Sequence, residues 1–146
     1  MATGDEALAM GAEALAAFMA REFPQVAEDF AIERVAPREI DVRLRVDERH
    51  LRPGGTVSGP SMFALADVSV YLAVLAMIGP AALAVTTGCS MDFMRKPAAG
   101  TDMIARCRLL KLGRVLAVGD VLLYSEGMDE PVARASMTYS IPPARG

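Results

Sequence analysis

The sequence predicts an α+β fold in which an antiparallel sheet wraps around one long central helix. Its 146 residues suit a single domain with room for a core, so we treat residues 1–146 as one domain. Residues 59–78 carry a single charged side chain, and a helix that is apolar all round needs cover on every side. The chain after residue 79 divides into strand-length segments separated by turn residues, and a sheet built from them supplies part of that cover.

The first predicted element is an amphipathic N-terminal helix within residues 1–24, clearest between Asp5 and Glu22. Pro24 ends the pattern, in which apolar side chains recur at helical spacing, namely Leu8, Ala12, Leu15 and Met19. The acidic Asp5 and Glu6 stand where a secretory signal would carry positive charge, so we expect a cytoplasmic protein.

Two strands are expected after this helix, a shorter one over residues 30–35 and a longer one from Ile40 to Val46. In the longer segment apolar and charged side chains alternate, which is the period-two pattern of a half-exposed strand. The stretch LRPGGTVSGP that follows has the glycines and prolines of a loop.

The central helix is predicted to begin at Gly59 or Pro60 and to stop before Gly79-Pro80, because Pro favours the first helical position and Gly-Pro terminates helices. Residues 68–87 are uncharged and long enough to span a bilayer. However, the pair at 79–80 would break such a span, and no Lys or Arg anchors either flank. We therefore predict a buried helix followed by a buried strand, and no membrane association.

Four further strands are expected, over Leu83–Phe93, Met103–Leu110, Arg114–Leu123 and Pro131–Ile141. The breaks between them contain Gly or Pro. The stretches KLGR and SEGMDEP are typical of hairpin turns, with Gly available where a positive φ is needed.

Composition and charge exclude several classes of function. A net charge of −3, 5% aromatic residues and no Trp provide neither a basic footprint nor a stacking platform for nucleic acid. Cys89 and Cys107 are far apart and fit no metal or redox spacing, so we expect free, buried thiols. The one histidine, His50, has no partner in sequence and is expected to be a surface or hydrogen-bonded residue, and no metal site is predicted.

Asp67 is the one charge in the central helix, and an ionised carboxylate in apolar surroundings is costly unless it is paired or hydrogen-bonded. From the residues alone, Asp67 is either a satisfied structural acid or a working general base. Gly59 lies eight residues earlier, ~12 Å along the helix axis, so the two cannot touch one carbonyl group within one chain. They can do so if two copies of the helix pair antiparallel about a two-fold axis.

These residues resemble a known family. The stretch SGPSMFALAD, the later TGCSMDFMRKPAAG, a GR hairpin and the final ARASMTYSI are similar to the hotdog-fold acyl-CoA thioesterases of the phenylacetate-degradation (PaaI-like) type. The resemblance covers about residues 30–141. Its sharpest motif is a glycine followed by F-x-L-A-D at the start of the central helix, matched here by Gly59, Phe63, Leu65, Ala66 and Asp67.

The resemblance implies a hotdog fold with active sites at a dimer interface. It implies that the Gly59 amide polarises a thioester carbonyl while Asp67 of the partner subunit activates water or attacks the carbonyl directly, and we prefer the general-base role. Thr86 or Thr87 matches the hydroxyl position that orients Asp67 or the water, although either one also suits an ordinary strand. Phe63 is assigned to substrate binding.

The sequence departs from the family at three positions. Members usually have an asparagine six residues before a histidine that immediately precedes the glycine, and these positions hold Arg52 and Ser58. Pro60 follows Gly59 where glycine is common, and it is assigned to substrate binding. Ser58 offers either a hydroxyl near the carbonyl or a helix cap, and Arg52 offers either a substrate contact or a solvated charge.

A coenzyme A thioester also needs partners for its phosphates. Arg95 and Lys96, together with Lys111 and Arg114 at the hairpin, are the candidates, with solvated loop charges as the alternative.

The function expected from these residues is that of an acyl-CoA thioesterase for an aromatic or medium-length acyl group. It would act as a homodimer or homotetramer, with no cofactor apart from the coenzyme A of its substrate. The alternative is a non-catalytic acyl-CoA or fatty-acid binding protein on the same scaffold. A third interpretation is a purely structural dimer in which Asp67 fixes the register.

Overall fold

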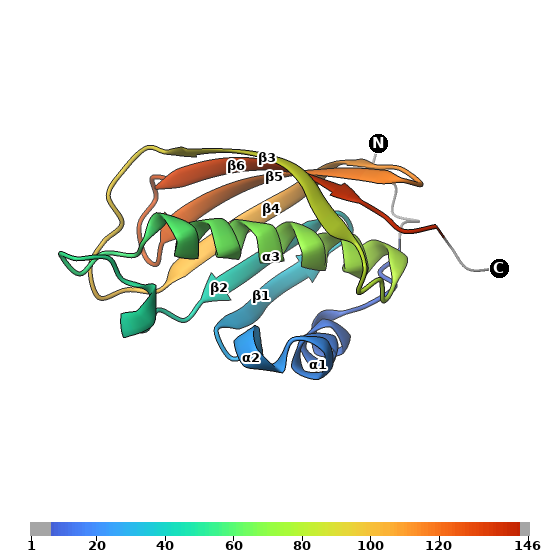
Figure 1. Ribbon diagram of the computed structural model, residues 1–146, viewed down its shortest axis with the longest axis horizontal. Helices are drawn as coiled ribbons and strands as arrows, with labels where there is room; N and C mark the ends of the chain where they lie inside the picture. The colour runs from blue at the N-terminus through green and yellow to red at the C-terminus, as the bar shows by residue number, and fades with distance from the viewer. Residues whose placement is uncertain (1–6, 144–146) are drawn as a thin grey trace.

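The computed structural model describes residues 7–143, in which one six-stranded antiparallel sheet wraps around a long helix, α3 (Gly59–Ile78) (Figure 1). The spatial strand order β1-β2-β4-β5-β6-β3 places β1 and β3 at the two edges. The predicted α+β architecture is confirmed, and the strand ends differ from the predicted ones by one or two residues. The strands are β1 (Phe30–Ala36), β2 (Glu39–Leu44), β3 (Val85–Phe93), β4 (Met103–Leu112), β5 (Leu116–Ser125) and β6 (Ala133–Ser140).

The N-terminal segment differs from its prediction, because α1 spans only Ala12–Glu22 and the residues just before it are not helical. The backbone N–H groups of Ala9 and Met10 donate to the Ala76 carbonyl near the end of α3, at 2.7 and 3.1 Å. These bonds hold the segment against α3 and satisfy donors that a first helical turn would leave unpaired. The predicted start of the helix at Asp5 lies outside the described residues.

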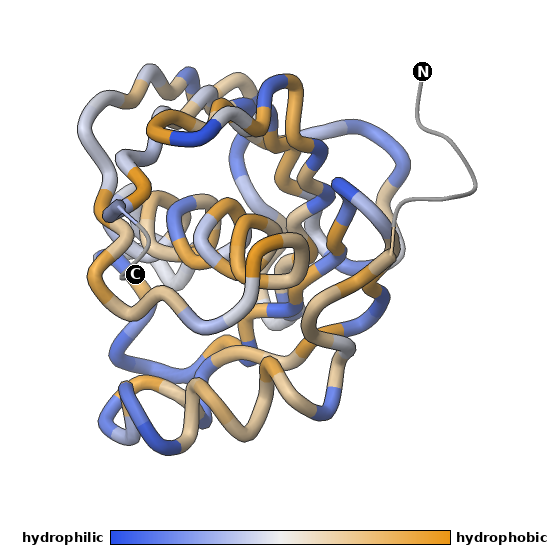
Figure 2. The backbone as a smooth tube through the Cα atoms, turned by 90° about the vertical axis from the view of Figure 1, so that its right-hand side faces the viewer, coloured by the Kyte–Doolittle hydropathy of each residue, from blue (hydrophilic) through white to orange (hydrophobic). Residues whose placement is uncertain are grey.

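The side chains of α3 form the centre of the core. Figure 2 looks along this helix and shows its hydrophobic residues at the middle of the molecule, with the sheet around them. On one flank, α1 and α2 (Pro24–Ala27) cover the helix, and Phe18 and Phe23 lie 6.3 and 5.7 Å from Tyr71 between ring centroids. By length and composition α3 could cross a bilayer, but most of it is buried in this core.

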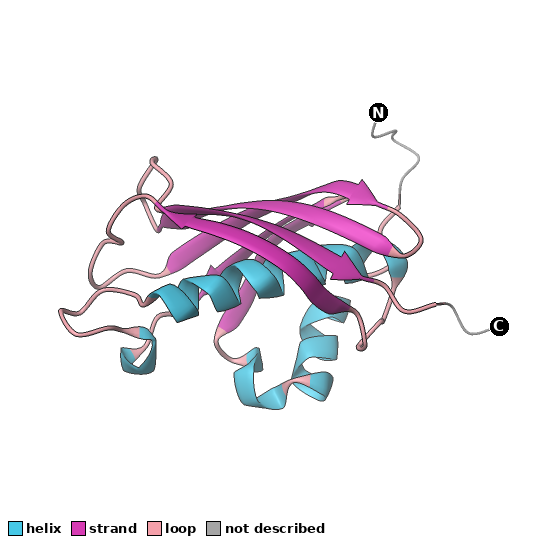
Figure 3. Cartoon of the chain, turned by 45° about the horizontal axis from the view of Figure 1, so that its top comes forward, coloured by secondary structure: helices cyan, strands magenta, loops and turns pink. Residues whose placement is uncertain are grey.

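The two edges of the sheet differ in character. β1 carries the exposed Glu33 and Arg34 with a bulge beside them, which are features that discourage pairing with another strand. β3 has one charged residue, Asp92, and is exposed along most of its length, including Val85 and Phe93 at 56% and 54%. Figure 3 shows β3 at the opposite side of the sheet from β1, paired with β6 alone.

The prediction that both thiols are buried is wrong for one of them. Cys107 is buried in β4, where burial raises the pKa of its thiol to about 12. Cys89 is exposed, because it lies at the middle of the edge strand β3 and not under the sheet.

A close approach between the sheet and the helix occurs at Gly119 of β5. A Cβ atom at this position would lie 2.8 and 2.9 Å from the two methyl carbons of Val70, which is fully buried in α3. A valine side chain in a helix has one strongly preferred rotamer, so it cannot turn away without strain. The absence of a side chain at 119 therefore sets how closely the sheet packs on the helix.

We predict that Gly119→Ala lowers the free energy of unfolding by about 1–3 kcal/mol, because it overpacks this contact. The matched control is Gly88→Ala in β3, where the nearest atom to the new methyl group is Thr138 Cβ at an ordinary 3.9 Å. Both changes restrict the unfolded chain equally, so the comparison isolates the contact with Val70. Urea denaturation measures the difference, and equal midpoints for the two variants would contradict this account of the packing.

Candidate active site

Asp67 lies on α3, two turns after its start, and is half-buried. Thr86 Oγ1 donates a hydrogen bond to Asp67 Oδ1 at 2.5 Å, and Tyr139 Oη donates to the same oxygen at 2.8 Å. Within residues 7–143, Oδ2 has no hydrogen-bond partner and the carboxylate has no ion-pair partner. The acid is thus held by two hydroxyl dipoles on one oxygen, while its other oxygen is free to act on a ligand.

The two hydroxyls reach one oxygen because of the strand register. Thr86 of β3 and Tyr139 of β6 are directly opposite one another in the antiparallel pair, so their side chains share the face that looks toward α3. Thr87 points the other way, is exposed, and donates to the Thr138 carbonyl at 3.4 Å. Of the two threonines that the sequence offered, Thr86 contacts the acid and Thr87 does not.

Tyr139 is a contact of the acid that the sequence analysis missed. Its side chain is 3% exposed, and burial, with the nearby charge of Asp67 second, raises the pKa of Tyr139 far above its ordinary value of about 10. The phenol therefore stays protonated and remains a donor at neutral and moderately alkaline pH. The alternation of the last strand, ARASMTYS, could have placed residue 139 on the inner face with Met137.

The backbone N–H of Gly59 is the free donor of the first turn of α3. Ser58 is the N-cap, and its Oγ accepts from the Ser61 N–H at 3.2 Å. Pro60 has no N–H, and the Met62 N–H donates to the Ser58 carbonyl at 3.1 Å. No acceptor for the Gly59 N–H lies among the described residues, so this amide and the positive end of the helix dipole face outward.

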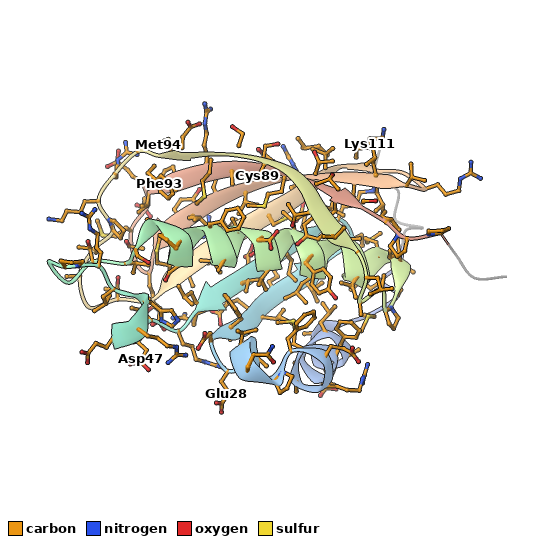
Figure 4. All side chains as sticks on the ribbon, viewed as in Figure 1. Glu28, Asp47, Cys89, Phe93, Met94 and Lys111 are labelled. Carbon is orange, nitrogen blue, oxygen red and sulfur yellow. The ribbon has the colours of Figure 1, made fainter. Side chains whose placement is uncertain are left out.

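Gly59 lines a cavity of about 490 Å³. Its cationic wall is Arg52, Arg95 and Lys96, and none of the described residues that line it is acidic. Arg95 is engaged by Glu130 at 3.1 Å, whereas Arg52 and Lys96 make no ion pair within residues 7–143. Phe93, at the end of β3 (Figure 4), also lines this cavity, and its Cζ lies 3.4 Å from where a Cβ of residue 59 would stand.

The structure does not bring all predicted site residues together. Arg114 lines a separate depression beside Ile78 at the other end of α3, away from both Gly59 and Asp67, because the hairpin before β5 lies at that end of the sheet. Phe63 is 37% exposed and lies one turn after Gly59 and one turn before Asp67, on the same side of the helix. Pro60 is exposed beside it.

Asp67 lines a second cavity, of about 270 Å³, together with Thr86 and Tyr139. Gly59 does not line this cavity, and Asp67 does not line the one in front of Gly59. The two groups are ~12 Å apart along α3. One chain therefore presents an oxyanion-type donor in a cationic cavity and a free carboxylate oxygen in another cavity, both on the side of α3 that the sheet leaves open.

His50 is a hydrogen-bonded structural residue. Its Nδ1 accepts from the Asp47 N–H at 2.8 Å, its Nε2 lies 3.4 Å from Asp29 Oδ2, and burial lowers its pKa. Its carbonyl accepts from the Ser58 N–H at 2.8 Å and so fixes the residue that caps α3. Over the part of the chain that the structure describes, no group of three His, Cys, Asp or Glu side chains is placed to hold a metal ion.

Comparison with known proteins gives a consistent result. Residues 54–132 match the family model of the thioesterase superfamily. A Pseudomonas aeruginosa protein named "Putative esterase" is 34% identical over 107 residues, which are 73% of this chain and 78% of that protein. A crystal structure of a "putative thioesterase" from a Silicibacter species is 61% identical, covers 96% of this chain and 97% of its own, and superposes with a TM-score of 0.89. A mutant of the phenylacetic acid degradation protein PaaI from Thermus thermophilus is 32% identical, with coverages of 82% and 99% and a TM-score of 0.70.

We predict that Tyr139→Phe changes how stability depends on pH. The folded protein keeps the phenol proton that the unfolded chain releases above pH ~10, so the stability due to this group is present below that pH and is lost as the pH rises further. At pH ~8 the variant should be about 1–3 kcal/mol less stable, because a buried donor to a carboxylate is removed.

Above pH ~10 the difference between the two proteins should shrink by about 1.4 kcal/mol per pH unit. Urea denaturation of both proteins at pH ~8, ~10 and ~11 measures this trend. A difference in stability that stays constant across the range would show that Tyr139 is not a buried, protonated donor.

Proposed function

The chain belongs to the thioesterase superfamily, and we propose that it hydrolyses acyl-CoA thioesters at composite sites in a homodimer. The glycine and F-x-L-A-D motif predicts a hotdog fold similar to PaaI-type structures, and the chain has this fold and this similarity. Its relatives support hydrolysis of a thioester in general. The acyl-CoA substrate, the roles of Asp67 and Gly59 and the dimer form the proposal.

The observation that carries the proposal is the separation of Gly59 and Asp67 into two cavities on one open side of α3. A carbonyl group needs its oxygen at the donor and its carbon near the base, which ~12 Å within one chain does not allow. Antiparallel pairing of two α3 helices about a two-fold axis would place the Gly59 amide of each chain near Asp67 of the other. Each dimer would then contain two equivalent sites.

The exposed edge of β3 supports this mode of association. The strand presents nine residues with an unpaired edge and a single charge. Its exposed apolar side chains include Val85 and, at its end, Phe93 (Figure 4 labels Phe93). Such an edge invites pairing with another strand, and a second copy of β3 would satisfy it with an antiparallel partner. Pairing there would continue the sheet across the dimer and bring the open sides of the two α3 helices together. A tetramer would require a further contact between dimers.

The proposed reaction is general-base hydrolysis. Asp67 Oδ2 takes a proton from water as the water oxygen bonds to the thioester carbonyl carbon. The negative charge that develops on the carbonyl oxygen is stabilised by the Gly59 N–H at the helix N-terminus. The carbon–sulfur bond then breaks, the thiolate of coenzyme A receives the proton that Asp67 took from water, and the carboxylic acid product leaves with the Asp67 carboxylate restored. No cofactor takes part in these steps.

The cationic cavity suits the phosphates of coenzyme A. Arg52 and Lys96 have no ion pair within the described residues, and Arg95 lies beside them, so a phosphate would gain charge-assisted hydrogen bonds there. Ser58 has a different role, since its hydroxyl is engaged with Ser61 as the helix cap. We propose that the family's histidine position has become a structural one in this chain and that Arg52 contributes to substrate binding.

The second candidate function is an acyl-CoA or fatty-acid binding protein without turnover. It is favoured by the same two positions, Arg52 and Ser58, at which this sequence departs from the usual pattern. Stabilisation by acyl-CoA without release of thiol would identify it.

We predict that Asp67→Asn lowers kcat for acyl-CoA hydrolysis by about 100-fold or more, because the amide cannot accept the proton of water. Release of free thiol from a panel of acyl-CoAs measures the rate. The matched control is Asp129→Asn, an exposed aspartate in the turn before β6 that should keep wild-type kcat. Undiminished hydrolysis by Asp67→Asn would remove Asp67 from the mechanism.

Mixing two inactive variants tests the composite site directly. In Gly59→Val, the added side chain would meet Phe93 and cover the amide, so both this variant and Asp67→Asn should be inactive alone. After unfolding and refolding an equimolar mixture, about half of the dimers are mixed, and each mixed dimer has one site with both native groups.

The mixture should therefore recover about a quarter of the wild-type activity, as measured by thiol release. Each variant refolded alone is the control and should recover none. A mixture as inactive as its components would mean that Gly59 and Asp67 act within one chain or not together.

A further inference from the structure

We infer that the cavity of about 270 Å³ beside Asp67 holds the acyl group, and that α1 and α2 form its size-limiting wall. This inference rests on the proposed function, because it assigns the part of the substrate on the far side of the carbonyl from coenzyme A. The base must lie next to the carbonyl carbon, so the acyl chain that continues from that carbon has to enter the space adjoining Asp67.

The chemistry of the lining selects an uncharged acyl group. Among the described residues that line it, Asp67 alone is charged, and the hydroxyls of Thr86 and Tyr139 are already bonded to Asp67. The Tyr71 hydroxyl donates to the Ala82 carbonyl at 3.4 Å, so it too has a partner. A second carboxylate, as in a dicarboxylic acyl group, would find no cation in this space and would be repelled by Asp67.

The volume indicates the size of the acyl group that the cavity accommodates. An apolar protein cavity of ~150 Å³ can hold a benzene molecule, so about 270 Å³ accommodates one aromatic ring with a short linker, or an alkyl chain of intermediate length. Long-chain acyl groups exceed this volume and would have to extend beyond the cavity.

The wall that sets this limit comes from the N-terminal segment. Met19 of α1, Val26 of α2 and Phe23 between these helices line the same cavity as Asp67. Phe23 packs edge-on against Tyr71 at 5.7 Å and 88°, and Tyr71 lies 6.0 Å from Tyr139. These ring contacts fix the wall relative to the acid, so the size of residues 23 and 26 determines how far an acyl chain extends.

The test is kcat/KM for straight-chain acyl-CoAs from acetyl to dodecanoyl, with benzoyl-CoA and succinyl-CoA, in dimeric wild type and three variants. Val26→Phe narrows the cavity. It should lower kcat/KM at least ~10-fold for the longest acyl-CoA that the wild type hydrolyses well, and should change kcat/KM for acetyl-CoA by less than ~2-fold. Phe23→Ala widens it and should extend activity to longer chains. Val35→Phe, a half-buried valine of β1 outside the cavity, is the control and should keep the wild-type order.

The two proposals fail in different ways. If the wild type hydrolyses the panel but Val26→Phe and Phe23→Ala keep its chain-length order, or if succinyl-CoA is a good substrate, the acyl-pocket inference is wrong and the proposed function stands. If the wild type hydrolyses none of the panel, the proposed function fails. The acyl-pocket inference is then tested by the thermal stabilisation that fatty acids of increasing length produce. Val26→Phe must lose the stabilisation by the longer acids, whereas Val35→Phe must retain it.

Discussion

The molecule depends on covering one helix that is apolar on nearly every side. A single curved sheet covers α3 from one direction, and the missing side chain of Gly119 allows it to approach Val70 closely. The N-terminal helices cover the flank around Tyr71. The remaining side, toward the N-terminal half of α3, is where Phe63 and Asp67 lie partly exposed. Incomplete burial thus leaves one place for chemistry and for a second subunit, and the proposed dimer uses it for both.

The hydrogen-bond partners of Asp67, on this open side, differ from those of the acids on the outer surface. There, Arg43 lies within 3.2 Å of Glu33, 2.9 Å of Asp102 and 2.7 Å of Glu126, and these partners raise its pKa. Asp67 instead receives two neutral hydroxyls. A cation beside it would neutralise its charge, whereas the neutral hydroxyl donors fix its position and leave the negative charge in place.

Local patterns in the sequence were sufficient for the framework. The central helix spans Gly59–Ile78, between the glycine and the Gly-Pro pair that mark its ends in sequence, and every predicted strand is present. The contacts of Asp67 were harder to predict, because Tyr139 reaches it only through the register of β6 against β3, and register is set by pairing across the fold. The contact between Phe93 and Gly59 and the exposure of Cys89 have the same origin, since both depend on which strand lies at the sheet edge. The extended segment before α1 was missed because its donors bond to Ala76, distant in sequence.

The paired hydroxyls on Asp67 Oδ1 also have a kinetic consequence. A carboxylate held by donors from two strands occupies one rotamer, so the conformational entropy of orienting it is lost when the chain folds and not when a ligand arrives. The orientation of the free oxygen therefore depends on the pairing of two strands that are distant in sequence. Slippage of β3 against β6 by one residue would turn the threonine away and leave the acid able to rotate, even if every functional side chain were still present.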